Sequence, residues 1–235
     1  MATAFIQTDK YTGLTVNSDL QKAADGFRIL GYKVLPFTQI DETFAIKGQC
    51  SPVIGTIDTM SELFNLLRVD IPNFDYVENI GRNIYKTTVD KFILTFDGTP
   101  KFIKPIKNKI FDGIVIGSYE NLNYIKFAKG EEIYVSDVLD IDSEWRFYVH
   151  YGNTLNWSHM KGNIFNLPSF TTVKKIISSI KNPPVSYTVD VAKLHDNSTV
   201  LVELNDFYAI GSYGLDCETY SKMLEQRYFE ILKNN

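Results

Sequence analysis

Short apolar runs and one amphipathic segment alternate along the first part of the chain. Residues 4–8 and 32–37 are rich in β-branched and aromatic side chains, which favours strands. Between them the apolar positions repeat at helical spacing, with a capping box formed by Ser18 and Gln21 at the start and Gly31 after the end. This strand–helix–strand order predicts a parallel sheet.

The pattern that follows is less regular. Residues 43–48 and 51–55 read as two short strands. Thr59 and Glu62 have the spacing of a second capping box and predict a helix there. Residues 82–93 carry a weaker helical pattern, so a third helix is expected before the character of the chain changes.

From Phe92 onward, strand-like segments follow one another closely. The segments expected as strands are residues 92–96, 101–106, 113–118, 124–128, 132–139, 144–152 and 154–160. After them come a helix near residues 173–180, a hairpin over 186–206 and a final helix over 217–231. The pattern predicts an α/β unit at residues 1–90 followed by an α+β unit with antiparallel sheets at 91–235.

Composition narrows the class of protein. The 235 residues include 24 basic and 28 acidic side chains, a net charge of −4 that argues against a general duplex nucleic-acid binder. The two cysteines, Cys50 and Cys217, suit reduced thiols better than a disulfide framework. The N-terminal residues resemble no signal peptide and no apolar run is long enough to span a bilayer, so a cytoplasmic protein is expected. Oligomeric state cannot be read from the sequence.

The stretch "TVLVELND", residues 199–206, places an acid and an amide in an apolar strand. Strict alternation puts Glu203 and Asn205 on one face together with Leu201. If the hairpin turn is centred between Asp196 and Asn197, then Asp190 lies directly across from Glu203.

Two opposed carboxylates on a sheet repel each other. A divalent cation would remove that penalty, and Mg²⁺ binds carboxylate and amide oxygens together with phosphates. Asp190, Glu203 and Asn205 are therefore candidate metal ligands. The alternative is a solvated face on which the acids are simply exposed.

Basic residues upstream add to this picture. Lys104 lies inside an apolar strand, where it needs an anionic partner, and Lys107 and Lys109 follow in a short loop that ends at Gly113. Lysine serves as a point charge to phosphate, although a solvated basic loop would explain the last two lysines equally well. Arg146 shares a strand face with Glu144, so it either binds an anion or forms a structural pair with that glutamate.

The order of these motifs resembles the ATP-grasp superfamily. The motifs are "FIKP", the basic loop, "EEIYVSDVL", "EWRFYV", "DVAK" and "VELND". The chain looks most similar to a compact clade of the superfamily found in phages and bacteria, over roughly residues 50–215. The resemblance implies an ATP-grasp fold with a minimal lid at roughly residues 91–135.

The resemblance also implies a role for each motif. Lys104 would contact the phosphates of ATP and, with Arg146 facing the transferred phosphoryl group, would be catalytic. The remaining nucleotide-binding positions would be the loop lysines Lys107 and Lys109, the hinge beside adenine, and Glu144; the hinge consists of Ser136, Asp137, Val138 and Leu139. Asp190, Glu203 and Asn205 would hold Mg²⁺.

The activity implied is an ATP- and Mg²⁺-dependent ligation of a carboxylate to an amine through an acyl phosphate. Its partners would be small-molecule or peptide carboxylates and amines, whose identity the sequence does not reveal. Two other readings remain open: a non-catalytic ATP-binding module, and a covalent nucleotidyltransferase related to polynucleotide ligases, because "KIFDG" approximates their lysine motif. The segment "GSYG", residues 211–214, either shapes a substrate pocket or forms a turn.

Overall fold

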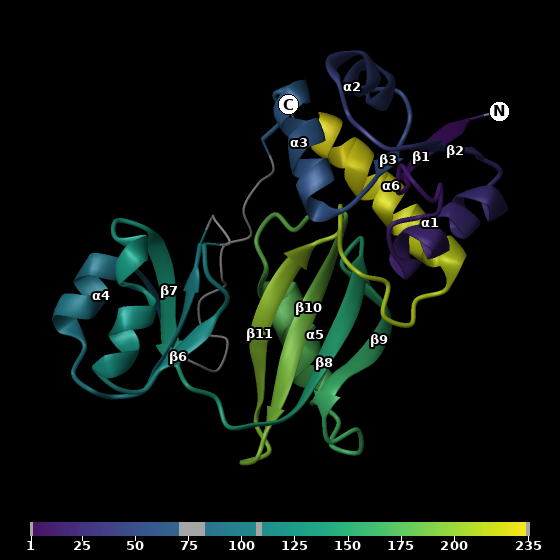
Figure 1. The fold of residues 1–235 in the computed structure, drawn as a ribbon. Helices are drawn as coiled ribbons and strands as arrows, with labels where there is room; N and C mark the ends of the chain where they lie inside the picture. The colour runs from purple at the N-terminus through teal and green to yellow at the C-terminus, as the bar shows by residue number, and fades with distance from the viewer. Residues whose placement is uncertain (1, 71–82, 107–109, 234–235) are drawn as a thin grey trace.

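The computed structural model describes residues 2–70, 83–106 and 110–233, and Figure 1 draws the remaining residues in grey. The first sheet contains β1 (Thr3–Gln7), β2 (Lys33–Phe37) and β3 (Val53–Ile54) in the order β2-β1-β3. Both pairings are parallel, as the strand–helix–strand pattern predicts.

The helices that pack around this sheet are α1 (Ser18–Ile29), α2 (Glu42–Gly48), α3 (Ile57–Leu67) and α6 (Cys217–Lys233). The C-terminal helix α6 thus returns to the N-terminal unit and lies beside α1 (Figure 1). The two helices approach so closely that a Cβ at Gly26 would lie 1.9 Å from the carbonyl oxygen of Cys217. The Ser221 hydroxyl also donates to the Ala23 carbonyl at 2.8 Å.

A second sheet is antiparallel and has the order β4-β7-β5-β6. Its strands are β4 (Ile84–Thr88), β5 (Lys101–Pro105), β6 (Ile114–Ile116) and β7 (Glu132–Asp137). The helix α4 (Val89–Thr95) and the 3-10 turns η1 (Glu120–Tyr124) and η2 (Lys126–Ala128) contribute to its apolar core. We call this unit the lid sheet.

The third sheet is antiparallel, with the order β11-β10-β8-β9. It consists of β8 (Ile141–His150), β9 (Asn153–Gly162), β10 (Ser186–Leu194) and β11 (Thr199–Asp206), and we call it the core sheet. Helix α5 (Phe170–Ser179) covers one face and packs on Phe147, Val189 and their apolar neighbours (Figure 1). The opposite face of the sheet carries the polar candidates.

The mixed α/β class with antiparallel sheets is confirmed, but several element assignments were wrong. Residues 43–48 belong to helix α2, which begins because the Asp41 carboxylate accepts the Phe44 N–H at 2.7 Å. Residues 92–96 lie mostly in helix α4, and 124–128 form 3-10 turns. The described part of residues 82–93 divides into strand β4 and the start of α4.

The capping residues also differ from the expected ones. The helix predicted from Ser18 is capped by Asn17, whose side chain accepts the Leu20 N–H at 2.9 Å. Helix α3 begins after Thr56, not Thr59. The division into residues 1–90 and 91–235 stays a prediction.

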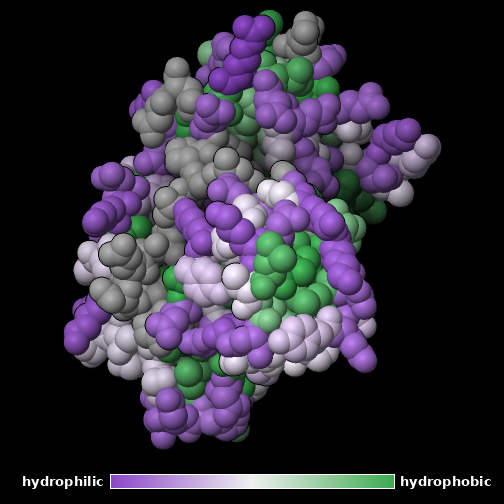
Figure 2. Space-filling view, turned by 90° about the vertical axis from the view of Figure 1, so that its left-hand side faces the viewer, coloured by the Kyte–Doolittle hydropathy of each residue, from purple (hydrophilic) through white to green (hydrophobic). Residues whose placement is uncertain are grey.

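Figure 2 shows one side of the molecule, where a confined hydrophobic patch is surrounded by hydrophilic side chains. Of the helices in the described ranges, none combines the length and hydropathy needed to cross a membrane.

Candidate active site

The acidic hairpin is formed by β10 and β11. Asp190 pairs directly with Glu203, which confirms the predicted register at this position. The route to it differs from the prediction, because Lys193 pairs with Thr199 and the turn is therefore centred on Asp196. A β-bulge between Asp190 and Val191 absorbs the one-residue difference.

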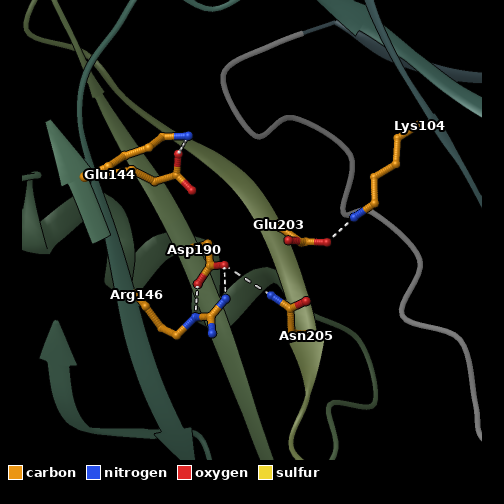
Figure 3. Close-up of polar contacts among 7 residues, drawn as sticks. Lys104, Glu144, Arg146, Asp190, Glu203 and Asn205 are labelled. Atoms are coloured by element: carbon orange, nitrogen blue, oxygen red, sulfur yellow. Dashed lines mark hydrogen bonds and ion pairs between the residues drawn. The ribbon is translucent and has the colours of Figure 1, made fainter. Parts of the chain in front are cut away.

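The bulge also changes which side chains share a face. Leu201 is fully buried and packs in the cluster under α5, together with Val191 and Leu204. The prediction that Leu201 shares a face with Glu203 and Asn205 was therefore wrong. The irregularity turns Glu203 and Asn205 away from α5, as Figure 3 shows for the two labelled side chains beside Asp190.

Asp190 is almost fully buried and forms a two-point ion pair with Arg146. Nε of Arg146 donates to Oδ1 at 2.8 Å and Nη2 donates to Oδ2 at 2.7 Å. Asn205 adds a third donor, from Nδ2 to Oδ2 at 3.1 Å. Burial raises the pKa of the Asp190 carboxyl above its usual value, and the Arg146 charge opposes that rise.

Arg146 is held on a second side by an aromatic ring. Its guanidinium carbon lies 5.1 Å from the ring centroid of Tyr213, within cation–π range. The suggested structural pair between Arg146 and Glu144 was wrong, because Glu144 pairs with Lys161 at 2.8 Å. The role of Arg146 at a phosphoryl group stays a prediction.

Glu203 forms an ion pair with Lys104 of strand β5. Figure 3 shows Lys104 extending across the gap from the lid sheet toward Glu203 on the core sheet. The two side chains are 37% and 32% exposed, so Lys104 is neither deeply buried nor dependent on a ligand for an anionic partner, as the sequence suggested. The contact links the two antiparallel sheets at the site.

Two cavities meet at this ion pair. The larger has a volume of about 660 Å³ and the smaller about 260 Å³. Phe102, Lys104 and Glu203 line both of them. A ligand that fills the smaller cavity would therefore contact the same lysine and glutamate as a ligand in the larger one.

The smaller cavity brings together several predicted nucleotide-binding residues. Asp137, Val138, Leu139 and Glu144 line it beside Lys104. Within the described ranges, no backbone hydrogen bond outside the ladders involves Val138 or Leu139, so their peptide groups are available to a flat ligand edge. Ser136 is buried and, like Arg146 and Asp190, does not line either cavity.

The larger cavity lies between the lid sheet, strand β11 and the N-terminal unit. Besides the shared residues, its walls include Asn205 from β11 and Gly211 from the following loop. The N-terminal unit contributes Asp19, Leu20 and Thr56. Asn205 connects this cavity to the buried Asp190–Arg146 pair through its hydrogen bond.

Some of these contributors were missed in the sequence. Phe102 alternates with Lys104 on β5, but nothing marked it as a cavity residue. A Cβ at Gly113 would lie 2.5 Å from Cζ of Phe102, so this glycine allows the ring to approach the loop. Lys161 and the loop after β11 carried no motif that identified them. Lys107 and Lys109, and with them the lysine of the "KIFDG" motif, lie outside the described residues.

The candidate metal ligands fit a hard divalent cation. Asp190 and Glu203 face each other on neighbouring strands, and Asn205 follows two residues along. Asn205 donates its amide NH₂ to Asp190, which leaves its amide oxygen for another partner. No cluster of three or more His, Cys, Asp or Glu residues occurs in the described ranges, so the amide would complete the oxygen set that Mg²⁺ prefers.

Comparisons with solved structures show the same fold at low sequence identity. N5-carboxyaminoimidazole synthetase from Staphylococcus aureus superposes with a TM-score of 0.61 and 16% identity, covering 97% of this chain and 77% of that chain. D-cycloserine synthetase DcsG gives 0.57 and 11%, covering 97% and 100%. ATP-bound D-alanine–D-alanine ligase from Bacillus anthracis gives 0.54 and 12%, covering 100% and 98%.

No curated protein matches the sequence. A family model described as an ATP-grasp domain, the second family of one clade of the superfamily, matches residues 80–223, which is more than half of the chain. The match includes the lid sheet, the hinge and both strands of the acidic hairpin. The chain therefore belongs to the ATP-grasp superfamily, in the clade and family that this model describes.

Proposed function

We propose that this protein is an ATP- and Mg²⁺-dependent ligase that joins a carboxylate to an amine through an acyl phosphate. The observation that carries the proposal is the Lys104–Glu203 contact at the wall shared by the two cavities. ATP occupies the smaller cavity, with its adenine beside Val138 and Leu139. The carboxylate and amine substrates occupy the larger one.

The reaction balances without a protein nucleophile. A carboxylate oxygen attacks the terminal phosphorus of ATP, the bond from that phosphorus to the bridging oxygen breaks, and ADP leaves. The amine then attacks the acyl carbon, a C–N bond forms, inorganic phosphate leaves and the amine loses a proton. Catalysis of this kind depends on positioning and on stabilising the developing charge.

Each named side chain has a part in that positioning. Lys104 exchanges Glu203 for the phosphates, where a lysine acts as a point charge. Arg146 holds Asp190 in place and faces the transferred phosphoryl group with the remaining edge of its guanidinium. Asp190, Glu203 and Asn205 would hold Mg²⁺, which supplies charge neutralisation at the phosphates.

Support for bond formation comes from the fold neighbours, which are named as synthetases and a ligase. Among other neighbours, a second structure of the N5-carboxyaminoimidazole synthetase is described as complexed with ADP. The substrates are proposed to be small-molecule or peptide carboxylates and amines.

The proposal is tested by measuring ADP release from ATP and Mg²⁺ over a panel of carboxylates, each with and without an amine. We expect release to require one particular carboxylate and to be abolished in Lys104→Met. Lys126→Met is the matched control, because Lys126 is a lid lysine that donates to Asn123 at 2.7 Å and lines neither cavity. Equal loss in both variants, or nucleotide binding without turnover on any carboxylate, would contradict the ligase assignment.

A further inference from the structure

One carboxylate in the larger cavity has no cationic partner among the described residues. Asp19 of helix α1 lines this cavity and is half-buried. We propose that Asp19 binds the ammonium group of a small primary amine or amino acid that is a substrate of the enzyme. This inference rests on the proposed function and names the chemical class of one substrate.

The two oxygens of Asp19 have different surroundings. Oδ1 accepts two hydrogen bonds from Ser212, at 2.9 Å from its backbone N–H and at 2.7 Å from its hydroxyl. Oδ2 receives no hydrogen bond from any residue in the described ranges. The basic side chain one helical turn along, Lys22, is directed elsewhere and donates to the Leu215 carbonyl at 2.8 Å.

The backbone at Gly211 lies directly beside the open oxygen. A Cβ on Gly211 would be 3.1 Å from Oδ2 of Asp19 and 2.6 Å from Cε2 of Tyr213. Because glycine has no Cβ, the space next to Oδ2 stays open to the cavity that both residues line. The "GSYG" segment therefore shapes the cavity wall.

The charge of the cavity favours a cation near Asp19. Among the described residues that line it, the acids are Asp19, Asp112 and Glu203, and the only base is Lys104, which Glu203 already engages. A carboxylate partly withdrawn from water is stabilised by a charged donor. An ammonium group supplies three N–H donors and a full positive charge.

The remaining walls near Asp19 set the shape of the ligand. Leu20, Ile54 and Ile210 are apolar, and Tyr220 uses its hydroxyl to donate to the Ile210 carbonyl at 2.7 Å. These surfaces suit an aliphatic body next to the ammonium group. A short alkylamine and an aliphatic amino acid share this chemistry, and the two are separated by whether a carboxylate is needed.

The test uses Asp19→Asn, which removes the charge but keeps an oxygen to accept both Ser212 hydrogen bonds. ADP release is measured with the aliphatic amino acids and with propylamine and putrescine as probes, at saturating ATP and Mg²⁺. We expect the KM for the active probe to rise roughly ten- to a hundred-fold, as for the loss of a hydrogen bond to a charged group, with the KM for ATP unchanged.

Asp112→Asn is the matched control, since it removes the same charge from an exposed residue of the same cavity. An unchanged KM in this variant and a raised KM in Asp19→Asn would support the assignment. Activity with propylamine alone identifies an amine substrate, whereas activity only with amino acids identifies the zwitterion.

Two results would overturn the inference and leave the proposed function standing. The first is carboxylate-dependent ADP release that responds to none of the amino acids or amines. The second is an Asp19→Asn variant with a lowered melting temperature and an unchanged KM for the active probe, which would make Asp19 only an anchor for Ser212. Absence of turnover on every carboxylate would instead remove the proposed function, and the inference with it.

Discussion

Replacing Arg146 by methionine removes one partner of the most buried ion pair at the site. The side chains of Arg146 and Asp190 are 8% and 3% exposed, and two hydrogen bonds of 2.8 and 2.7 Å join them. In the variant Asp190 would remain as a buried carboxylate with only the Asn205 amide donating to it among the described residues. Breaking a buried pair in this way costs about 3–5 kcal/mol of unfolding free energy.

The pH dependence of that cost has a definite sign. Burial already raises the pKa of Asp190, and Arg146 is the group that opposes the rise, so removing it raises the pKa further. The folded variant then binds a proton more readily than the unfolded chain does. Its stability is therefore highest at acidic pH and falls as the pH rises through the folded pKa of Asp190.

Urea unfolding at neutral and at mildly acidic pH measures both effects. Lys161→Met is the control, because the Lys161–Glu144 pair has a lysine that is 66% exposed and its loss should cost at most about 1 kcal/mol. The double variant Arg146→Met/Asp190→Leu should recover most of the stability. A loss below about 1 kcal/mol in Arg146→Met, or an equal loss at both pH values, would refute the reasoning.

Three further predictions concern ligands. Lys104→Met should weaken ATP binding about tenfold or more while lowering the unfolding free energy by no more than about 1 kcal/mol, since its pair with Glu203 is part-exposed; calorimetry and urea unfolding measure the two. Glu203→Gln should reduce the dependence of nucleotide affinity on Mg²⁺, which titrations with and without the cation would reveal. ATP with Mg²⁺ at about a hundred times its dissociation constant should stabilise the wild type by roughly 2.7 kcal/mol, and an unchanged melting curve would contradict specific binding.

The pairing of Asp190 with Glu203 was predictable from the sequence, but its structural basis was not. The "HDNS" turn cluster and the two-residue period placed the pair correctly. The true turn is shifted and a bulge compensates, because alternation carries no signal for a single extra residue. The face of Leu201 was wrong for the same reason.

Helices with mainly apolar and β-branched residues were the main local failures. Residues 92–96 read as a strand, yet they extend helix α4, which begins where the Thr88 hydroxyl accepts the Lys91 N–H. In short apolar runs the period is ambiguous, and capping decides the outcome.

Contacts between distant segments were beyond local pattern altogether. Neither the return of α6 to the N-terminal sheet nor the approach of Asp19 to Ser212 has a signature in sequence spacing. The larger cavity depends on both contacts, so its walls could be identified only from the fold. The smaller cavity was more accessible to prediction, because its hinge and Glu144 lie close together in the sequence.

The central claim is that ATP activates a carboxylate as an acyl phosphate. Hydroxylamine added to the protein with ATP, Mg²⁺ and the active carboxylate should intercept that intermediate as a hydroxamate, with one ADP and one phosphate formed for each hydroxamate. The same reaction with Lys104→Met should give none. Formation of AMP and pyrophosphate in place of ADP would contradict the account and indicate adenylation.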